Sequence, residues 1–129
     1  LNGHSNTLSL IINEDFWTKV LTHDKNGVKY SDEQIKNYKY GIVKHEILHI
    51  LFKDLFNYHM FSDKRLGNMA VDLRVNQYIK EEQLPMADDI CLMKNFPHFF
   101  PDPTGKDANQ TSMYYMGFWS KSWLKPLRY

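Results

Sequence analysis

Cysteine is nearly absent from this sequence, and long hydrophobic runs are missing. The one cysteine, Cys91, excludes an internal disulfide and any cysteine-based zinc cluster in the chain. So little cysteine favours a reducing compartment, and a cytoplasmic location is expected. The longest apolar run, from Ile47 to Phe52, is interrupted by His49 and is much too short to span a bilayer. No membrane partner is therefore expected.

The sequence also lacks a surplus of charge of either sign. Sixteen Lys and Arg residues nearly balance fifteen Asp and Glu residues, and the net charge is +1. Overall charge therefore gives no support to a nucleic-acid partner. With 129 residues, of which 43% are apolar, the chain suits one compact domain over residues 1–129. Because it begins with Leu1 rather than Met, a fragment of a longer chain is also compatible with the sequence.

The N-terminal third is expected to hold a strand, a short helix and a turn. Residues 8–12, with β-branched residues at the end, are predicted to form a strand. Asn13 has the side chain of a helix cap, and a short helix is predicted to run from there to about Leu21. The pair Asn26-Gly27 indicates a turn, either at a hairpin tip or in a loop.

The strongest helix prediction covers residues 31–58. Ser31 and Gln34 form a capping box, and apolar residues at helical spacing continue as far as Tyr58. In the later part of this helix, apolar residues occupy nearly all of its faces, as expected for a buried helix. Gly41 lies inside it, where glycine costs stability, so a close approach of another segment is predicted there.

Two further helices are predicted. One covers residues 65–82 and ends before Leu84-Pro85, since proline stops a helix. The other covers residues 112–123, after a proline-containing loop region. The residues of the first of these helices that are expected in the core are Met69, Leu73, Val75 and Ile79.

The motif with the clearest chemistry is His45-Glu46-Ile47-Leu48-His49. Histidines four apart on a helix lie on one face, one turn apart, so both imidazoles can reach one metal ion. Glu46 lies about 100° round the helix from His45, where a carboxylate can take a proton from a metal-activated water. This arrangement predicts a zinc site with His45 and His49 as ligands and Glu46 as the catalytic group. Polar residues in so apolar a helix are costly unless they are paired or liganded.

The third ligand is not determined by the motif. Asn68, Asp72 and Asn76 form a polar stripe at four-residue spacing on the next helix. Such a stripe faces either solvent or a polar site, and Asp72 is its only anionic member. Two other candidates remain open: His59, ten residues after His49, and the pair Glu81-Glu82.

Two segments together resemble the metallopeptidase-like domain of bacteria and phages, which often precedes a von Willebrand A-like domain. These are residues 41–51, around the histidine motif, and the Asn-x-Ala-x-Asp-x-x-x-Asn pattern of residues 68–76. The resemblance covers most of residues 8–118. It implies zinc ligation by His45, His49 and Asp72 with Glu46 as the catalytic acid and base. Two departures stand out: Glu14 replaces a proline, and Lys53-Asp54 replaces a histidine that many members carry.

The expected fold is α+β and zincin-like, with an active-site helix and a second ligand helix packed on a small β-sheet. An edge strand near the site would hold an extended peptide substrate by strand addition. Asn68 and Asn76 are expected to orient Asp72 or to tie the two helices together. The candidate transition-state stabilisers are His59, Arg74 and Tyr78.

Three functions are compatible with these patterns. The first is a zinc-dependent peptidase that acts on peptides or proteins. The second is an inactive metallopeptidase-like module with a structural or interaction role, as in a phage. The intact Glu46 favours the first function over the second. The third is a nucleic-acid-associated protein whose aromatic and basic C-terminus stacks on bases. That C-terminus contains Phe118, Trp119, Lys121, Trp123, Lys125 and Arg128.

Overall fold

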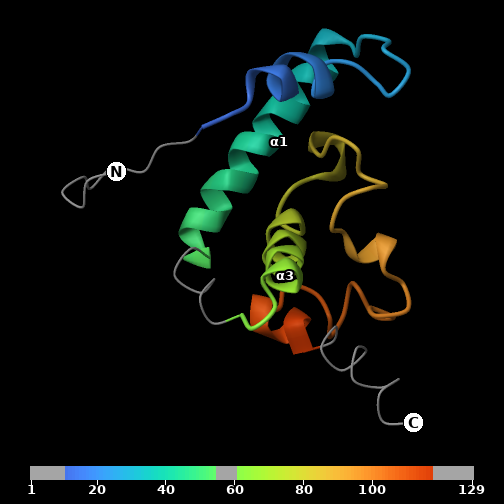
Figure 1. Cartoon of the computed structure of the whole chain (residues 1–129). Coiled ribbons are helices and arrows are strands. Elements are labelled where there is room, and N and C mark those ends of the chain that lie inside the picture. Colours follow the sequence, from blue (N-terminus) through green and yellow to red (C-terminus); the bar gives the residue numbers. More distant parts are fainter. Residues whose placement is uncertain (1–10, 55–60, 118–129) are drawn as a thin grey trace, which may run out of the picture.

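A computed structural model describes residues 11–54 and 61–117, and this part of the chain is built from helices and loops (Figure 1). The two long helices are α1, Asp32–Leu51, and α3, Lys64–Asn76. Three shorter helical turns accompany them: η1 (Phe16–Val20), η3 (Glu81–Gln83) and η4 (Met93–Asn95). None of the helices described is long and apolar enough to cross a membrane.

The predicted α+β fold with a small sheet is wrong for the described residues. They contain no strand, and their only β pairing is an isolated antiparallel bridge between His23 and Lys29. Of the predicted strand, residues 8–10 lie outside the described part, and Ile11 and Ile12 have no regular structure. Ile11 is 90% exposed. A β-branched run becomes a strand only where a second strand bonds to it, and no described segment does so. The zincin-like sheet and its peptide-binding edge are therefore not supported.

Two signals in the N-terminal segment are confirmed. The Asn13 side chain accepts a hydrogen bond from the Phe16 backbone N–H at 3.1 Å, and residues 14–20 are helical. The turn at Asn26-Gly27 is also present, with Gly27 at a φ of 81°, which glycine adopts readily. This segment and its turn pack near the first turns of α1 (Figure 1).

The start of α1 agrees with the sequence and its end does not. Ser31 caps the helix, and its hydroxyl oxygen accepts a hydrogen bond from the Gln34 backbone N–H at 3.2 Å. The helix was expected to continue to residue 58, but it ends at Leu51. Lys53 has a φ of 58°, a left-handed conformation that terminates helices. Residues 55–60 lie outside the described part of the chain.

Gly41 lies where another segment comes close to α1, as its position in the sequence predicted. A Cβ atom on Gly41 would lie 1.8 Å from the backbone oxygen of Gln83 in η3. Residue 41 is buried and lies one turn before His45. This contact therefore fixes the segment after α3 against the helix that carries the histidines.

Replacing Gly41 by alanine is expected to destabilise the protein by about 1–3 kcal/mol, since the added methyl group meets backbone that must move. Higher helix propensity of alanine would act in the opposite direction. Urea unfolding in the presence of a chelator measures the change without a contribution from metal binding. Gly117→Ala is the matched control, because a Cβ there has no atom within 4 Å. Equal midpoints for the two variants would contradict the prediction.

The second helix is shorter than predicted but has the expected core face. It begins after Asp63, whose carboxylate accepts a hydrogen bond from the Leu66 backbone N–H at 3.1 Å. It ends at Asn76 rather than at residue 82, and η3 follows just before Leu84-Pro85. Of the predicted core residues, Met69 is partly buried; the fully buried ones are Leu73, Val75 and Ile79.

Beyond α3 the chain forms loops that return to the two long helices (Figure 1). The main core lies around α3 and includes Phe61, Phe100 and Tyr115. Residues 112–117 are helical, and the rest of the predicted C-terminal helix lies outside the described part. The core thus holds α3 from the side opposite to α1.

Candidate metal centre

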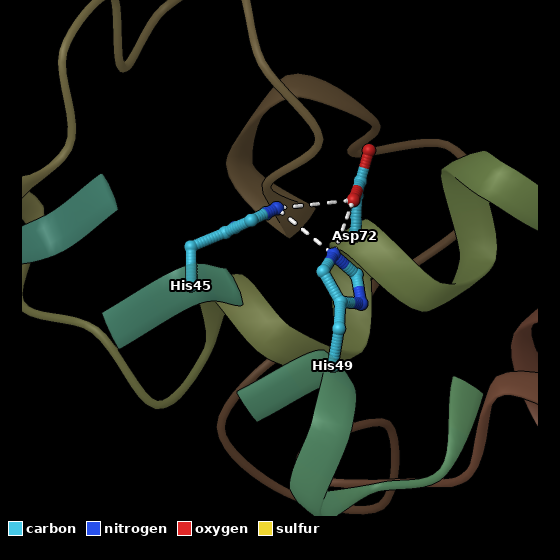
Figure 2. Close-up of side chains that lie close together, drawn as sticks. All are labelled: His45, His49 and Asp72. Carbon is cyan, nitrogen blue, oxygen red and sulfur yellow. Dashed lines mark hydrogen bonds and ion pairs between the residues drawn. The ribbon is translucent and has the colours of Figure 1, made fainter. Parts of the chain in front are cut away.

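Three side chains from α1 and α3 point toward one another in Figure 2. His45 Nε2 lies 3.0 Å from His49 Nε2 and 3.2 Å from Asp72 Oδ1. His49 Nε2 lies 3.0 Å from the same carboxylate oxygen. One ligand atom from each residue therefore occupies the corner of a small triangle, and the three form a group able to hold a metal ion.

The helices themselves place these atoms. The four-residue spacing on α1 brings the two imidazoles together edge to face, with ring centres 4.5 Å apart. On α3, Asp72 is flanked by the buried Val71 and Leu73, which anchor the helix in the core. Asp72 then projects from the opposite side toward α1. The choice between a solvated stripe and a site ligand is thus decided by how α3 packs.

A hydrogen bond from His45 to Asn76 orients the His45 ring. The Asn76 amide donates to the backbone oxygen of Cys91 at 3.1 Å, so its own oxygen faces His45. His45 Nδ1 lies 2.7 Å from that oxygen and must donate to it, because an amide oxygen only accepts. The Nε2 atom is therefore the one left with a lone pair toward the triangle. A buried second partner of this kind is usual behind metal-ligating histidines.

Asp54 plays the same part behind His49. Its Oδ2 atom lies 2.8 Å from His49 Nδ1, and its side chain is only 6% exposed. In a continuous helix a residue five positions on would lie about 140° away around the axis and could not make this contact. The left-handed Lys53 ends α1 and turns Asp54 back toward His49. No contact between Asp54 and His49 follows from the sequence, because a helix that continued to residue 58 would point Asp54 away from His49.

This arrangement favours a cation at the triangle. With both Nδ1 atoms donating outward, the two Nε2 atoms and the Asp72 oxygen are three acceptors within 3.2 Å of one another. Acceptors held so close repel unless a metal ion or a proton lies between them. Ligand atoms of a tetrahedral zinc, at ~2.0–2.2 Å from the metal, lie about 3.3–3.6 Å apart. Two imidazoles and a carboxylate with a nearly matching spacing fit zinc.

Without a metal, a proton takes its place. Burial would lower the pKa of His49, but the hydrogen-bonded carboxylates of Asp54 and Asp72 outweigh burial and raise that pKa to about 9. Burial would likewise raise the pKa of Asp72, but its hydrogen bonds to His45 and His49 outweigh burial and lower that pKa to about 2. The centre is thus electrostatically prepared for positive charge.

The pH dependence of stability follows from His49. In chelator, the free energy of unfolding should fall as the pH rises from 6.5 to about 9, since folded His49 keeps a proton that the unfolded chain releases. Zinc must displace that proton, so its affinity should rise up to about tenfold per pH unit over the same window. Urea midpoints measured against His49→Asn isolate this contribution. A wild-type profile parallel to that of the variant would contradict it.

Glu46 lines a pocket beside the centre. The pocket has a volume of about 340 Å³, and His45, Asp72 and Asn76 contribute to its wall together with Glu46. Glu46 therefore borders the same space as two of the three ligand residues. A reacting group bound in the pocket would have both the centre and Glu46 beside it.

Of the supporting residues and transition-state stabilisers that the sequence suggested, only some lie at the centre. Asn76 is 3% exposed and supports His45 rather than Asp72, while Asn68 is exposed and no hydrogen bond joins it to the centre. The Arg74 guanidinium stacks on the Phe52 ring at 3.9 Å, and Tyr78 packs on the same ring. Neither Arg74 nor Tyr78 is among the residues that line the pocket.

Glu81 and Glu82, two of the rival ligands, are not part of the group. Glu81 forms an ion pair with Lys94 at 2.8 Å, and both Glu81 and Glu82 are exposed on η3. His59, proposed both as a ligand and as a stabiliser, lies outside the described residues. Among the residues that the structure describes, Asp72 is therefore the one that completes the histidine pair.

Comparison with known proteins adds no relative to this geometry. No protein-family model matches the chain, and neither the curated proteins nor the solved structures contain a match.

Proposed function

We propose that this chain is a zinc-dependent peptidase domain, with His45, His49 and Asp72 as the metal ligands and Glu46 as the general base. The observation that carries the proposal is the triangle of acceptor atoms, 3.0–3.2 Å apart, beside a pocket that Glu46 also lines. The resemblance of residues 41–51 and 68–76 to bacterial and phage metallopeptidase-like domains points to the same activity.

Each residue has a defined part in this proposal. A zinc ion bound here would polarise a substrate carbonyl and make a water molecule more acidic. Glu46 takes the proton of the attacking water and delivers it to the leaving amine. Asn76 and Asp54 hold the two imidazoles with their Nε2 atoms toward the centre. Asp72 supplies the negative charge that offsets the metal.

The position of Glu46 supports this proposal over an inactive metal-binding module. A module that needs a metal only for stability has no use for a glutamate in the wall of the pocket beside the ligands. The third reading, stacking on nucleic-acid bases, depends on aromatic and basic residues that lie outside the described part. We also propose a reducing compartment, the cytoplasm, from the single unpaired Cys91.

Elemental analysis of the purified chain, followed by a protease assay, tests the proposal. We expect about one zinc per chain and hydrolysis of unfolded protein or peptide libraries that stops on chelation and returns when zinc is restored. Absence of bound zinc after incubation with zinc would rule out the metal centre. Bound zinc with no chelator-sensitive hydrolysis would leave the centre and rule out the peptidase.

A further inference from the structure

The pocket beside Glu46 has an apolar wall in addition to the polar residues of the centre that line it. The apolar wall is assembled from three places in the sequence: η1, α1 and the segment after η3. No lysine or arginine is among its lining residues. The apolar lining residues are Phe16, Ile42, Leu84, Pro85, Met86 and Ile90.

This wall is held in place by the core rather than by surface loops alone. Leu84 is 4% exposed, and Ile90 packs against the same small core cluster. The close contact of Gly41 with Gln83 sets the distance between α1 and this segment. A preformed apolar pocket favours apolar ligand groups, because their burial releases water and leaves no polar group without a hydrogen bond.

The size of the pocket restricts what enters. A volume of about 340 Å³ is near the lower end of the ~300–1,000 Å³ typical of ligand pockets, so it suits one large side chain with its adjoining backbone. Met86 lines this pocket and also a second, larger one of about 850 Å³, whose wall includes Lys19, Asp24 and Asp88. The second pocket therefore offers charged groups of both signs to the part of a bound polypeptide that continues beyond the side chain in the first pocket.

We infer that the apolar pocket is the specificity subsite of the proposed peptidase, and that it accepts a large aliphatic or aromatic side chain next to the cleaved bond. Met86 lines both pockets, so the substrate would pass it on the way from one to the other. The preferred substrates are therefore polypeptides with a residue such as leucine or phenylalanine beside the scissile bond. This inference rests on the proposed function, because the metal centre is what defines the cleaved bond.

Binding of hydroxamates to the zinc-loaded protein tests the subsite without requiring turnover. Acetohydroxamate provides the metal-binding group alone, and two further probes add a leucine-type or an aspartate-type side chain. Burial of a leucine side chain is expected to tighten binding about ten- to hundredfold over acetohydroxamate. The aspartate-type probe should show no such gain.

Two variants with the same change of charge test whether the preference for the leucine-type probe arises in this pocket. Met86→Lys places a cation on the pocket wall and should remove most of the preference for the leucine-type probe and improve binding of the aspartate-type probe. Met113→Lys makes the same change at a comparably exposed methionine, 50% against 45% exposed, that does not line the pocket. It should leave both affinities unchanged, and both variants should keep one zinc.

The outcomes separate the inference from the proposed function. If the zinc-loaded protein binds acetohydroxamate but does not prefer the leucine-type probe, the subsite is overturned and the metal centre stands. Equal effects of Met86→Lys and Met113→Lys would also overturn it. If the preference is found but no peptide is cleaved, the pocket still binds a large apolar side chain beside the metal, but the peptidase and the pocket's role next to a cleaved bond are both overturned. If the chain binds no zinc, both fall.

Discussion

Replacing Glu46 by glutamine is expected to lower peptide hydrolysis by about 10²–10⁴-fold while the protein keeps its zinc. Glutamine has nearly the same shape as glutamate but cannot take a proton from water. Glu46 contributes no ligand atom to the triangle of His45, His49 and Asp72, although it lines the adjoining pocket. The substitution therefore removes proton transfer and leaves the metal-binding atoms in place.

The measurement compares kcat/KM on a peptide library for the wild type and the variant, with zinc content determined on the same samples. Glu82→Gln makes the same chemical change at an exposed position on η3 and should retain full activity. Zinc-loaded wild type no more active than Glu46→Gln would contradict a role for Glu46 as general base. Loss of zinc in Glu46→Gln would instead assign that residue to the metal.

Replacing Asp72 by alanine is expected to weaken zinc binding by more than the ~10–100-fold typical of partners behind the ligands. The change removes one of the three converging atoms and the negative charge that it brings. His45 and His49 would remain, each still oriented by its own partner, Asn76 or Asp54. Two imidazoles alone make a weak site, since structural and catalytic zinc sites have at least three protein ligands.

Competition with a chromogenic chelator measures this affinity. Asn68→Ala is the matched control, because Asn68 lies one turn away on α3, is exposed and is not bonded to the centre. It should bind zinc as the wild type does. The assignment of Asp72 fails if Asp72→Ala and Asn68→Ala have equal affinity for zinc.

Local patterns in the sequence determined which side chains share a helix face. The cap at Ser31, the paired histidines and the polar residues of α3 all follow from spacings within one or two turns. Gly41 also signalled a close approach, since glycine inside a helix has a cost that packing must offset. Such features can be predicted because they depend only on neighbours along the chain.

The tertiary structure decided what those faces meet. It showed that the described residues form no sheet, because the β-branched segment at Ile11 and Ile12 has no strand to pair with. It ended α1 at Leu51, so that Asp54 turns back to His49, and it gave Asn76 rather than Asn68 a place behind the ligands. Helical periodicity brings His45 and His49 to one face, whereas the third acceptor and the pocket arise from α3 and residues 84–91, whose approach to α1 depends on packing between distant segments.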